Sequence, residues 1–364
     1  MSELERAREI INEVDREMAD LFCRRMEAVK KVAQYKQERG LPVLDSAREA
    51  AIIERNSALV EDDELRPYYV NFITSNMEIS RAFQHRLLEG MRVAYSGVPG
   101  AFANIAAMRI FPDGKAVSYP DFKSAYESVE KGECDCAVLP IENSHAGDVT
   151  QVMDLAFFGS LHLTGIYDLQ VVQNLLGVPG SRISLVTRVV SHQQALDQCA
   201  EYIREHNFTP EGATNTAVAA KQVAENADPT VAAIASVETA KLYGLQILER
   251  NINESSVNTT RFAVFSKAAR AENNADRHFF LFFTVKNEAG CLAKAINAIG
   301  DAGFNMRALK SRPTKELIWE YYFTAEIEGN PHTEKGHELL MRLGEICSSV
   351  KVLGSYDREL QLKG

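Results

Sequence analysis

Apolar side chains in residues 1–90 repeat at the three- and four-residue spacing of amphipathic helices. The first stripe starts at Leu4 and predicts one long helix to about Glu38, where a glycine and a proline follow. Two shorter helices, at about 46–60 and 67–88, are expected after it. This part of the chain is therefore expected to form an all-α domain.

Two cations lie on the apolar stripe of the first helix. Arg25 takes a skipped apolar position, and Lys36 lies one turn beyond Val32. A charge on a buried helix face is costly unless it is paired, so the simplest interpretation is that each side chain reaches a carboxylate or solvent. A rise of about 1.5 Å per residue puts the two backbones roughly 16 Å apart. Side chains of this length also have the reach to hold one small dianion between them.

Between residues 91 and 268, short apolar runs alternate with helical patterns, which predicts an α/β domain with a parallel or mixed sheet. The expected elements are a strand at 91–96, a helix through 106–108, a strand at 116–118, a helix at 122–131, a strand at 136–139, a helix at 149–158, strands at 163–172 and 189–190, a helix at 194–205, and strands at 231–235 and 261–265. The late return to a strand favours two lobes that the chain crosses twice, with a cleft between them.

Residues 277–358 predict a different architecture. The expected elements are a strand at 279–285, a helix at 290–302, strands at 305–311 and 317–327, a helix at 333–346 and a strand at 350–354. The order βαββαβ is that of a ferredoxin-like α+β fold. A fold of this kind does not by itself imply a function.

Composition narrows the class of protein. A chain of 364 residues suggests two or three domains, and 46% apolar residues without a bilayer-spanning run argue against a membrane protein. The net charge of −10 argues against a nucleic-acid partner, because phosphate contacts need clustered cations. Any anionic substrate therefore needs local positive charge. The scattered cysteines are expected to be free thiols, and an N-terminus without the apolar core of a signal peptide favours the cytoplasm.

Two polar clusters lie at the ends of expected strands. The run 258–261 comes directly before an apolar strand, and the run 140–147 follows another. Each alone is typical of a turn, but open α/β sheets bind ligands at strand ends, and two such ends can face one cleft. The loop 97–102 lacks the glycine spacing of a nucleotide-binding loop and is expected to shape a site for a carboxylate.

Three segments of this middle domain resemble the motifs of prephenate dehydratases. They are Pro-Ile-Glu-Asn-Ser at 140–144, Asn-x-Thr-Arg-Phe at 258–262 and Ser-His-x-Gln-Ala-Leu at 191–196. The resemblance implies a two-lobed domain of the periplasmic-binding-protein type. It also implies a reaction in which prephenate loses carbon dioxide and its ring hydroxyl to give phenylpyruvate.

The same resemblance implies roles for single residues. Thr260 would donate a hydrogen bond to the leaving hydroxyl, and because a threonine hydroxyl is a weak acid, Glu142 is a candidate to share that role. The implied substrate-binding residues are Asn143, Ser191, Gln198 and Arg261. Strand alternation leaves open whether Arg261 points into the cleft. His145 and His192 are candidate proton donors, but a lone histidine at a strand end more often has a structural role.

Residues 1–90 resemble the all-α chorismate mutase domain at Arg8, Arg25, Lys36, Asp45, Arg48, Glu49, Ser80 and Gln84. Its reaction is pericyclic and needs no acid, base or nucleophile, so catalysis comes from holding a compact conformer and stabilising the ether oxygen. The resemblance implies carboxylate contacts from Arg8, Arg25 and Arg48, ring-hydroxyl contacts from Asp45 and Glu49, and ether-oxygen contacts from Lys36 and Gln84. It also implies paired protomers in which Arg8 acts in the partner's site.

The C-terminal domain resembles the ACT regulatory domain of such dehydratases. The similar segments are 287–293, Ser311-Arg312-Pro313 and Trp319-Glu320-Tyr321. The resemblance implies that phenylalanine binds between paired domains, at Gly290, Cys291, Leu292, Ser311 and Arg312. Lys310 stands where the family usually has glutamate, which leaves the strength of feedback open.

Together these features predict three domains, at 1–90, 91–268 and 277–358. The expected protein is a bifunctional enzyme that converts chorismate to prephenate and then to phenylpyruvate, with phenylalanine as effector. It is expected to use no metal or organic cofactor and to form at least a homodimer. Two alternatives remain: a dehydratase acting on arogenate, and a two-lobed sensor of aromatic acids without turnover.

Overall fold

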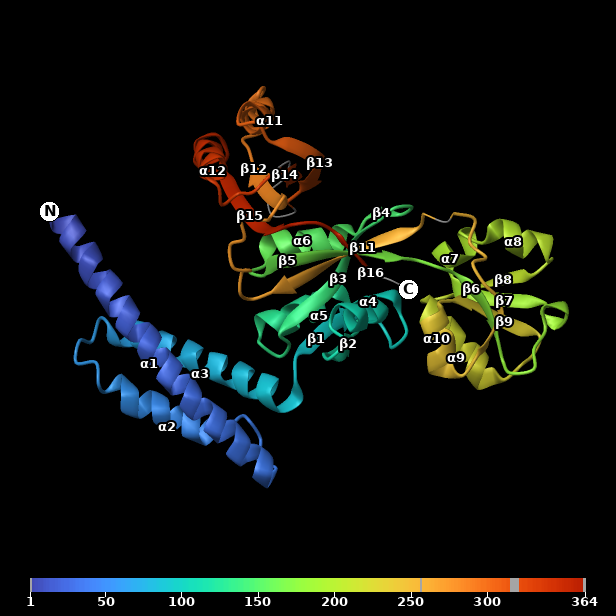
Figure 1. The fold of residues 1–364 in the computed structure, drawn as a ribbon, viewed down its shortest axis with the longest axis horizontal. Coiled ribbons are helices and arrows are strands. Elements are labelled where there is room, and N and C mark those ends of the chain that lie inside the picture. Colours follow the sequence, from blue (N-terminus) through green and yellow to red (C-terminus); the bar gives the residue numbers. More distant parts are fainter. Residues whose placement is uncertain (1, 256, 315–320, 363–364) are drawn as a thin grey trace. The chain divides into compact units, whose positions relative to one another are not determined.

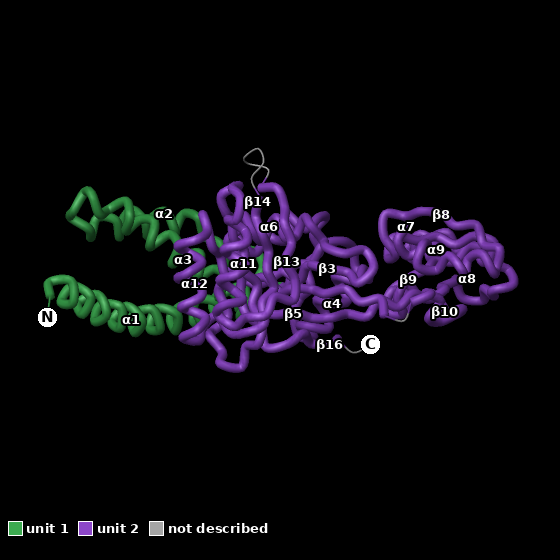
Figure 2. Tube along the Cα trace, turned by 90° about the horizontal axis from the view of Figure 1, so that it is seen from above, with its two compact units in different colours: residues 1–92, 132–135 green, residues 93–131, 136–364 purple. Residues whose placement is uncertain are grey.

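The computed structural model describes residues 2–255, 257–314 and 321–362. The chain divides into two compact units (Figure 2). Unit 1 is Met1–Arg92 with Gly132–Asp135, and unit 2 is Val93–Lys131 with Cys136–Gly364. The expected boundary at residue 90 lies next to the boundary between the units, and the last two expected domains belong to one unit.

Unit 1 contains the three expected helices (Figure 1). They are α1 (Glu3–Arg39), α2 (Ser46–Ser57) and α3 (Arg66–Glu89). A capping box between Ser2 and Glu5 starts α1, and Gly40, with a φ of 61°, ends it. The Asp45 side chain caps α2 by accepting a hydrogen bond from the Arg48 amide.

The apolar stripe of α1 is largely uncovered. Only Val29 and Ala33 of this helix are buried. Further towards the N-terminus, Leu4 is 60% exposed, Ile11 58% and Leu21 57%. Since apolar residues at helical spacing normally face a partner, this stretch of α1 has an apolar face that no other described part of unit 1 covers.

The first lobe of unit 2 is built on the strand order β16-β5-β11-β3-β1-β2, with β4 paired to β3. The strands are β1 (Arg92–Ser96), β2 (Lys115–Tyr119), β3 (Cys136–Asn143), β4 (Gly147–Asp148), β5 (His162–Gln170), β11 (Thr259–Ser266) and β16 (Leu360–Leu362). Its helices are α4 (Phe102–Ile110), α5 (Phe122–Glu130) and α6 (Thr150–Phe158). The fully buried residues of β3 and β11 form the centre of this sheet.

The second lobe has the strand order β10-β6-β9-β7-β8. Its strands are β6 (Asn174–Gly177), β7 (Arg188–His192), β8 (Thr209–Ala213), β9 (Val231–Ala235) and β10 (Gln246–Glu249). Its helices are the short 3₁₀ turn Ile183–Leu185, α7 (Gln193–Asp197), α8 (Ala200–Glu205), α9 (Thr216–Asn226) and α10 (Val237–Tyr243). Apolar clusters on both faces of the sheet form its core. The chain crosses between the lobes twice, after β5 and after β10, as expected for a two-lobed domain.

Two predicted elements of this domain differ in the structure: one strand is shorter than predicted, and one helix is split in two. The strand expected at 163–172 ends at Gln170, because the next residues cross between the lobes and pair with the returning segment through Val171 and Asn258. The helix expected at 194–205 is broken into α7 and α8 around Gln198. Strands β4, β6, β8, β10 and β16 and helices α9 and α10 were not predicted.

The C-terminal part of unit 2 has the expected βαββαβ order. Its elements are β12 (His278–Thr284), α11 (Cys291–Asp301), β13 (Asn305–Pro313), β14 (Tyr321–Glu328), α12 (Glu334–Ile346) and β15 (Ser349–Tyr356). The sheet order β13-β14-β12-β15 confirms the ferredoxin-like arrangement. Residues 317–320 of the expected third strand, with Trp319 and Glu320, lie outside the described residues.

The two faces of this C-terminal sheet have different partners. One face packs on α11 and α12. On the other face, Tyr322 stacks on Phe157 of α6 with ring centroids 4.1 Å apart. Gly354 of β15 approaches the Leu163 carbonyl of β5 so closely that a Cβ there would lie 2.0 Å from the oxygen. The C-terminal domain therefore packs directly on the first lobe.

Candidate active sites

A cavity of about 480 Å³ is lined by residues of both lobes of unit 2. Asn143 on β3 and Thr260 on β11 come from the first lobe, and Gln198 after α7 comes from the second. Gln173 and Asn258 lie in the segments that connect the lobes. This cavity is the cleft expected from the two polar clusters.

The Asn143 side chain is the fixed point of a network of amides in this cleft. Its Oδ1 accepts hydrogen bonds from the backbone N–H groups of His145, at 3.0 Å, and Ala146, at 2.9 Å. Because a backbone N–H can only donate, this contact decides which end of the amide is oxygen. The Nδ2 group of Asn143 therefore faces the other way, as a donor.

The donor end of Asn143 sets the direction of the remaining hydrogen bonds. Its Nδ2 donates to Thr260 Oγ1 at 2.9 Å and to Asn258 Oδ1 at 3.0 Å. Asn258 Nδ2 in turn donates to Gln198 Oε1 at 3.0 Å. Since Thr260 Oγ1 accepts from Asn143, its own O–H proton remains available for a ligand in the cleft.

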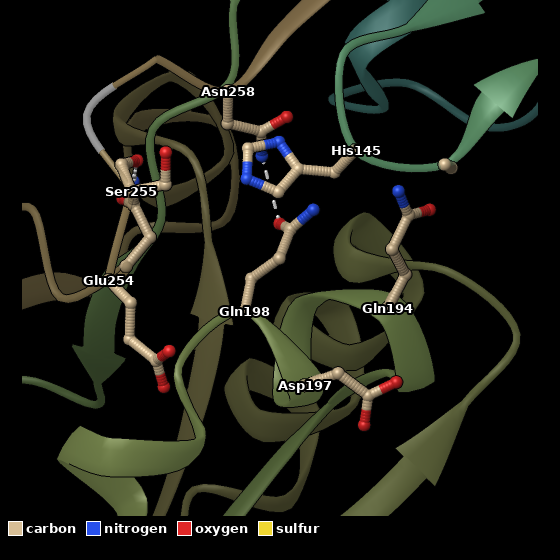
Figure 3. A pocket seen from close by; sticks show the side chains of 9 residues that line it. His145, Gln194, Asp197, Gln198, Glu254, Ser255 and Asn258 are labelled. Atoms are coloured by element: carbon tan, nitrogen blue, oxygen red, sulfur yellow. Dashed lines mark hydrogen bonds between the residues drawn. The ribbon is translucent and has the colours of Figure 1, made fainter.

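A second cavity of about 300 Å³ adjoins the cleft and shares Gln194, Gln198 and Asn258 with it (Figure 3). Figure 3 shows the hydrogen bond between Asn258 and Gln198, with the imidazole of His145 beside it. Asp197 and Glu254 give this side chamber two carboxylates. It is therefore a less favourable place than the main cleft for an anionic ligand.

The charge of the main cleft is low. Asp148 is the one Asp, Glu, Lys or Arg among the described residues that line it. Positive potential comes instead from helix N-termini, because Ala101 before α4, Val149 before α6 and Asn215 before α9 all line the cleft. Neither α4 nor α6 has a side-chain cap, and the N-terminus of such a helix favours an anion.

Three sequence-predicted residues do not line the cleft. Glu142 and Arg261 are register partners on β3 and β11, and side-chain alternation turns both to the face opposite Asn143 and Thr260. Their carboxylate and guanidinium contact each other at 3.2 Å. Ser191 is fully buried and its hydroxyl donates to the Ile234 carbonyl at 2.6 Å, so it joins β7 to β9. The structure therefore places Glu142, Arg261 and Ser191 outside the lining of the cleft, contrary to the expected grouping.

The cleft also contains amides that the sequence did not single out. Gln173 is 2% exposed, and its Oε1 has no hydrogen-bond partner among the described residues. Gln194 donates to Asn143 Oδ1 at 3.4 Å. Gln173 lies where the chain crosses between the lobes. The sequence prediction extended one strand from 163 to 172 and so did not mark this crossing. His192 caps α7 through its Nδ1, which agrees with a structural role.

In unit 1, three of the predicted residues form one cluster between α1 and α3. Arg25 donates to the Ser80 hydroxyl and, at 3.4 Å, to the Asn76 carbonyl. Gln84 is 7% exposed, and its Nε2 donates to the Ser80 carbonyl at 3.2 Å. Burial lowers the pKa of Arg25, but the guanidinium remains charged at neutral pH. The cluster offers a cation and a neutral amide donor side by side.

The other predicted residues of unit 1 lie around this cluster or in solvent. Lys36 donates to the Val43 carbonyl in the loop before α2. Glu49 pairs with Arg81, which joins α2 to α3. Arg8 and Arg48 are exposed. One described chain therefore brings Arg25, Ser80 and Gln84 together and leaves Arg8 pointing into solvent.

The predicted effector residues lie at one end of the C-terminal sheet. Gly290, with a φ of 84°, precedes α11, followed by the half-buried Cys291 and Leu292. Arg312 pairs with Tyr322 in the sheet register, and Tyr322 pairs with Thr284 at the end of β12. Ser311 is exposed. The Arg312 guanidinium forms an ion pair with Asp154 of α6 at 2.8 Å, so its positive charge is already neutralised within the chain.

The architecture defines a class of protein: an all-α domain in which a half-buried arginine clusters with Ser80 and Gln84, followed in the chain by a two-lobed α/β domain with a polar cleft. The family model for chorismate mutase type II matches residues 7–85, and that for prephenate dehydratase matches residues 93–270. A bifunctional chorismate mutase/prephenate dehydratase of Neisseria gonorrhoeae is 30% identical over 96% of this chain and 95% of its own length. The chain belongs to the bifunctional chorismate mutase/prephenate dehydratase family, and it is an enzyme with both domains.

Two further similarities each cover about three quarters of the chain. Arogenate dehydratase 1 of Petunia hybrida is 34% identical over 74% of this chain and 68% of its own length. The crystal structure of a prephenate dehydratase from Arthrobacter aurescens, in complex with L-Phe, is 27% identical. It covers 74% of this chain and 90% of that one, with a TM-score of 0.68. None of the helices among the described residues is both long and apolar enough to cross a bilayer.

Proposed function

We propose that the cleft of unit 2 converts prephenate to phenylpyruvate, with Thr260 as the donor to the leaving hydroxyl. The observation that carries this proposal is the hydrogen bond from Asn143 Nδ2 to Thr260 Oγ1. It leaves the threonine proton free to stabilise the hydroxide that develops as the carboxylate departs and the ring becomes aromatic. Asn143 is thereby a positioning residue for Thr260.

The substrate carboxylates would be held by backbone amides rather than by cations. The uncapped first turns of α4 and α6, and the first turn of α9 in the other lobe, border the cleft. Amides at such positions bind carboxylates without the cost of ordering a long cationic side chain. Gln198, which belongs to the second lobe, would close on the substrate from the opposite side.

We assign the mutase reaction to the cluster of Arg25, Ser80 and Gln84 in unit 1. The guanidinium and the amide form a fixed pair of donors, and chorismate needs donors rather than an acid or base to reach its compact conformer. Lys36, Asp45, Arg48 and Glu49 complete the substrate contacts. Arg8 lies at the far end of α1 and would act in the site of a second copy.

Pairing through the exposed apolar face of α1 predicts complementation between defective chains. Arg8→Ala and Arg25→Ala each remove mutase activity, but in a heterodimer one site receives an intact Arg25 and the partner copy's intact Arg8. Random pairing of co-expressed chains should restore about a quarter of the wild-type sites. Mutase turnover per chain in the unseparated mixture measures the result.

The matched control pairs Arg25→Ala with Gln84→Ala. Both residues belong to the same half of the site, because each is hydrogen-bonded to Ser80, so no mixture of these chains contains an intact site. Recovery in this control, or none in the Arg8 mixture, would contradict the exchange of α1 between copies.

We propose L-phenylalanine as an effector at the C-terminal domain. The prephenate dehydratase structure in complex with L-Phe, which is similar to 74% of the chain, supports the choice of ligand. The left-handed Gly290 at the start of α11 provides a close approach to backbone amides for an amino acid. Titration of the purified chain with phenylalanine, followed by calorimetry and by dehydratase rate, tests binding and inhibition separately.

Arogenate is a second candidate substrate, favoured by two observations. One is the similarity to an arogenate dehydratase. The other is Gln173, whose buried Oε1 has no hydrogen-bond partner among the described residues and would accept a hydrogen bond from the ammonium group of arogenate. Comparison of kcat/KM for the two substrates decides between them. The proposed function fails if neither substrate yields an aromatic product.

A further inference from the structure

Strands β3 and β11 carry two neighbouring residue pairs that point in opposite directions. Thr260 is the register partner of Asn143, and the next residue, Arg261, is the register partner of Glu142. The first pair lines the cleft, whereas the second lines a cavity that borders the C-terminal sheet. Because both pairs lie on the same two strands, contacts that fix the side chains of the second pair also fix the backbone that positions the first pair.

Arg261 is held mainly by the C-terminal domain. Its two terminal nitrogens form a fork with the Glu326 carboxylate of β14, at 3.0 Å each, and one also contacts Glu359 at 3.1 Å. The Glu326 side chain is only 5% exposed. Burial alone would raise the pKa of Glu326, but the hydrogen bonds and charge of Arg261 outweigh it and hold that pKa below its usual value. Such a buried, two-pronged contact fixes orientation as well as charge.

Lys310 of β13 makes the second contact. Its ammonium group donates to Glu142 Oε1 at 3.1 Å and to the Asp148 carboxylate on β4. Asp148 lines both the cleft and the cavity beside the C-terminal sheet. Burial alone would lower the pKa of Lys310, but Asp148 and Glu142 raise it above its usual value, so the ammonium stays charged.

We propose that the C-terminal domain completes the dehydratase site through these two contacts. Glu326 acts as a positioning residue, which fixes Arg261 and through it the placement of Thr260 opposite Asn143. Lys310 neutralises Asp148, the one carboxylate that lines the cleft among the described residues, and so permits a dianionic substrate to bind. Both residues lie beyond the segment that matches the dehydratase family model. The inference rests on the proposed role of the cleft.

The two contacts predict different kinetic changes, and mutase activity measured on the same samples separates them from a general loss of folded protein. In Lys310→Met the uncompensated Asp148 repels the substrate, so KM for prephenate should rise about five- to tenfold with kcat nearly unchanged. Adding Asp148→Asn to that variant removes the repelling charge and should restore KM. In Glu326→Gln a loosened Thr260 should lower kcat about tenfold or more, with KM nearly unchanged.

The controls use the full chain. Glu328→Gln changes an exposed carboxylate of the same strand, which contacts Asn305 at 2.9 Å, and should leave both constants unchanged. Glu326→Asp keeps the charge and should recover part of kcat. Mutase activity, measured on the same samples, should stay constant because its site lies in unit 1.

The inference is overturned if Lys310→Met keeps the wild-type KM, or if Asp148→Asn does not restore it. It is also overturned if Glu326→Gln keeps the wild-type kcat, or if its dehydratase kcat and its mutase activity decline in the same proportion. These outcomes require a wild-type chain that turns prephenate over. A wild type that does not would instead refute the proposed function.

Discussion

Replacing Thr260 with alanine should lower dehydratase kcat about 100- to 1,000-fold, with prephenate still bound. The threonine proton is the donor that the Asn143 contact leaves free, and no other described side chain is placed to replace it at the same strand end. Substrate affinity should change little, because the carboxylates are held elsewhere, at the helix N-termini. Steady-state rates and equilibrium binding of prephenate measure the two effects.

Two neighbouring substitutions serve as controls for Thr260→Ala. Thr260→Ser keeps a hydroxyl and should retain most of the turnover. Thr259→Ala alters the adjacent residue, which enters the network through its backbone carbonyl and amide, and should be close to wild type. Equal turnover in Thr260→Ala and wild type would refute the mechanism. Binding without any turnover in the wild type would instead favour the two-lobed sensor.

Replacing Arg25 with alanine should lower mutase kcat/KM by roughly 100-fold or more. The guanidinium is the charged member of the cluster with Ser80 and Gln84, and the pericyclic reaction depends on charge placed in advance. Dehydratase activity on added prephenate should not change. Conversion of chorismate, followed by the loss of its absorbance, gives the rate.

Arg24 supplies the control for this prediction. It precedes Arg25 on α1 but is exposed, so Arg24→Ala removes the same charge from a solvent-facing position of the same helix. Its mutase activity should remain within about twofold of wild type, since exposed charges contribute little to a remote site. An equal loss in both variants would indicate an effect on net charge or folding rather than on substrate binding.

The sequence was most informative where a periodic pattern ran without interruption. The stripe from Leu4 onwards predicted α1 nearly to its last residue, because a capping box and Gly40 mark its two ends. The order βαββαβ was also correct, since each element of the C-terminal domain has a clear apolar face. Sequence placed Thr260, Asn143 and Gln198 at one cleft, and the structure agrees.

Prediction was weakest where long-range packing decides the outcome. Motif matching grouped Glu142 and Arg261 with their neighbours, yet strand alternation sends them to the opposite face. Their partners Glu326 and Lys310 are distant in sequence and lie in the C-terminal domain, which has a different fold. Gln173 was missed because it lies where a strand ends to cross between lobes. None of these positions has a local pattern that reveals its partner.

The central claim is that one chain performs both reactions. The most direct test gives the purified chain chorismate and follows prephenate and phenylpyruvate together, with and without phenylalanine. The account predicts that prephenate appears first and phenylpyruvate follows, and that phenylalanine reduces the second product. Chorismate that remains unconverted, or prephenate that accumulates with no phenylpyruvate, would contradict it.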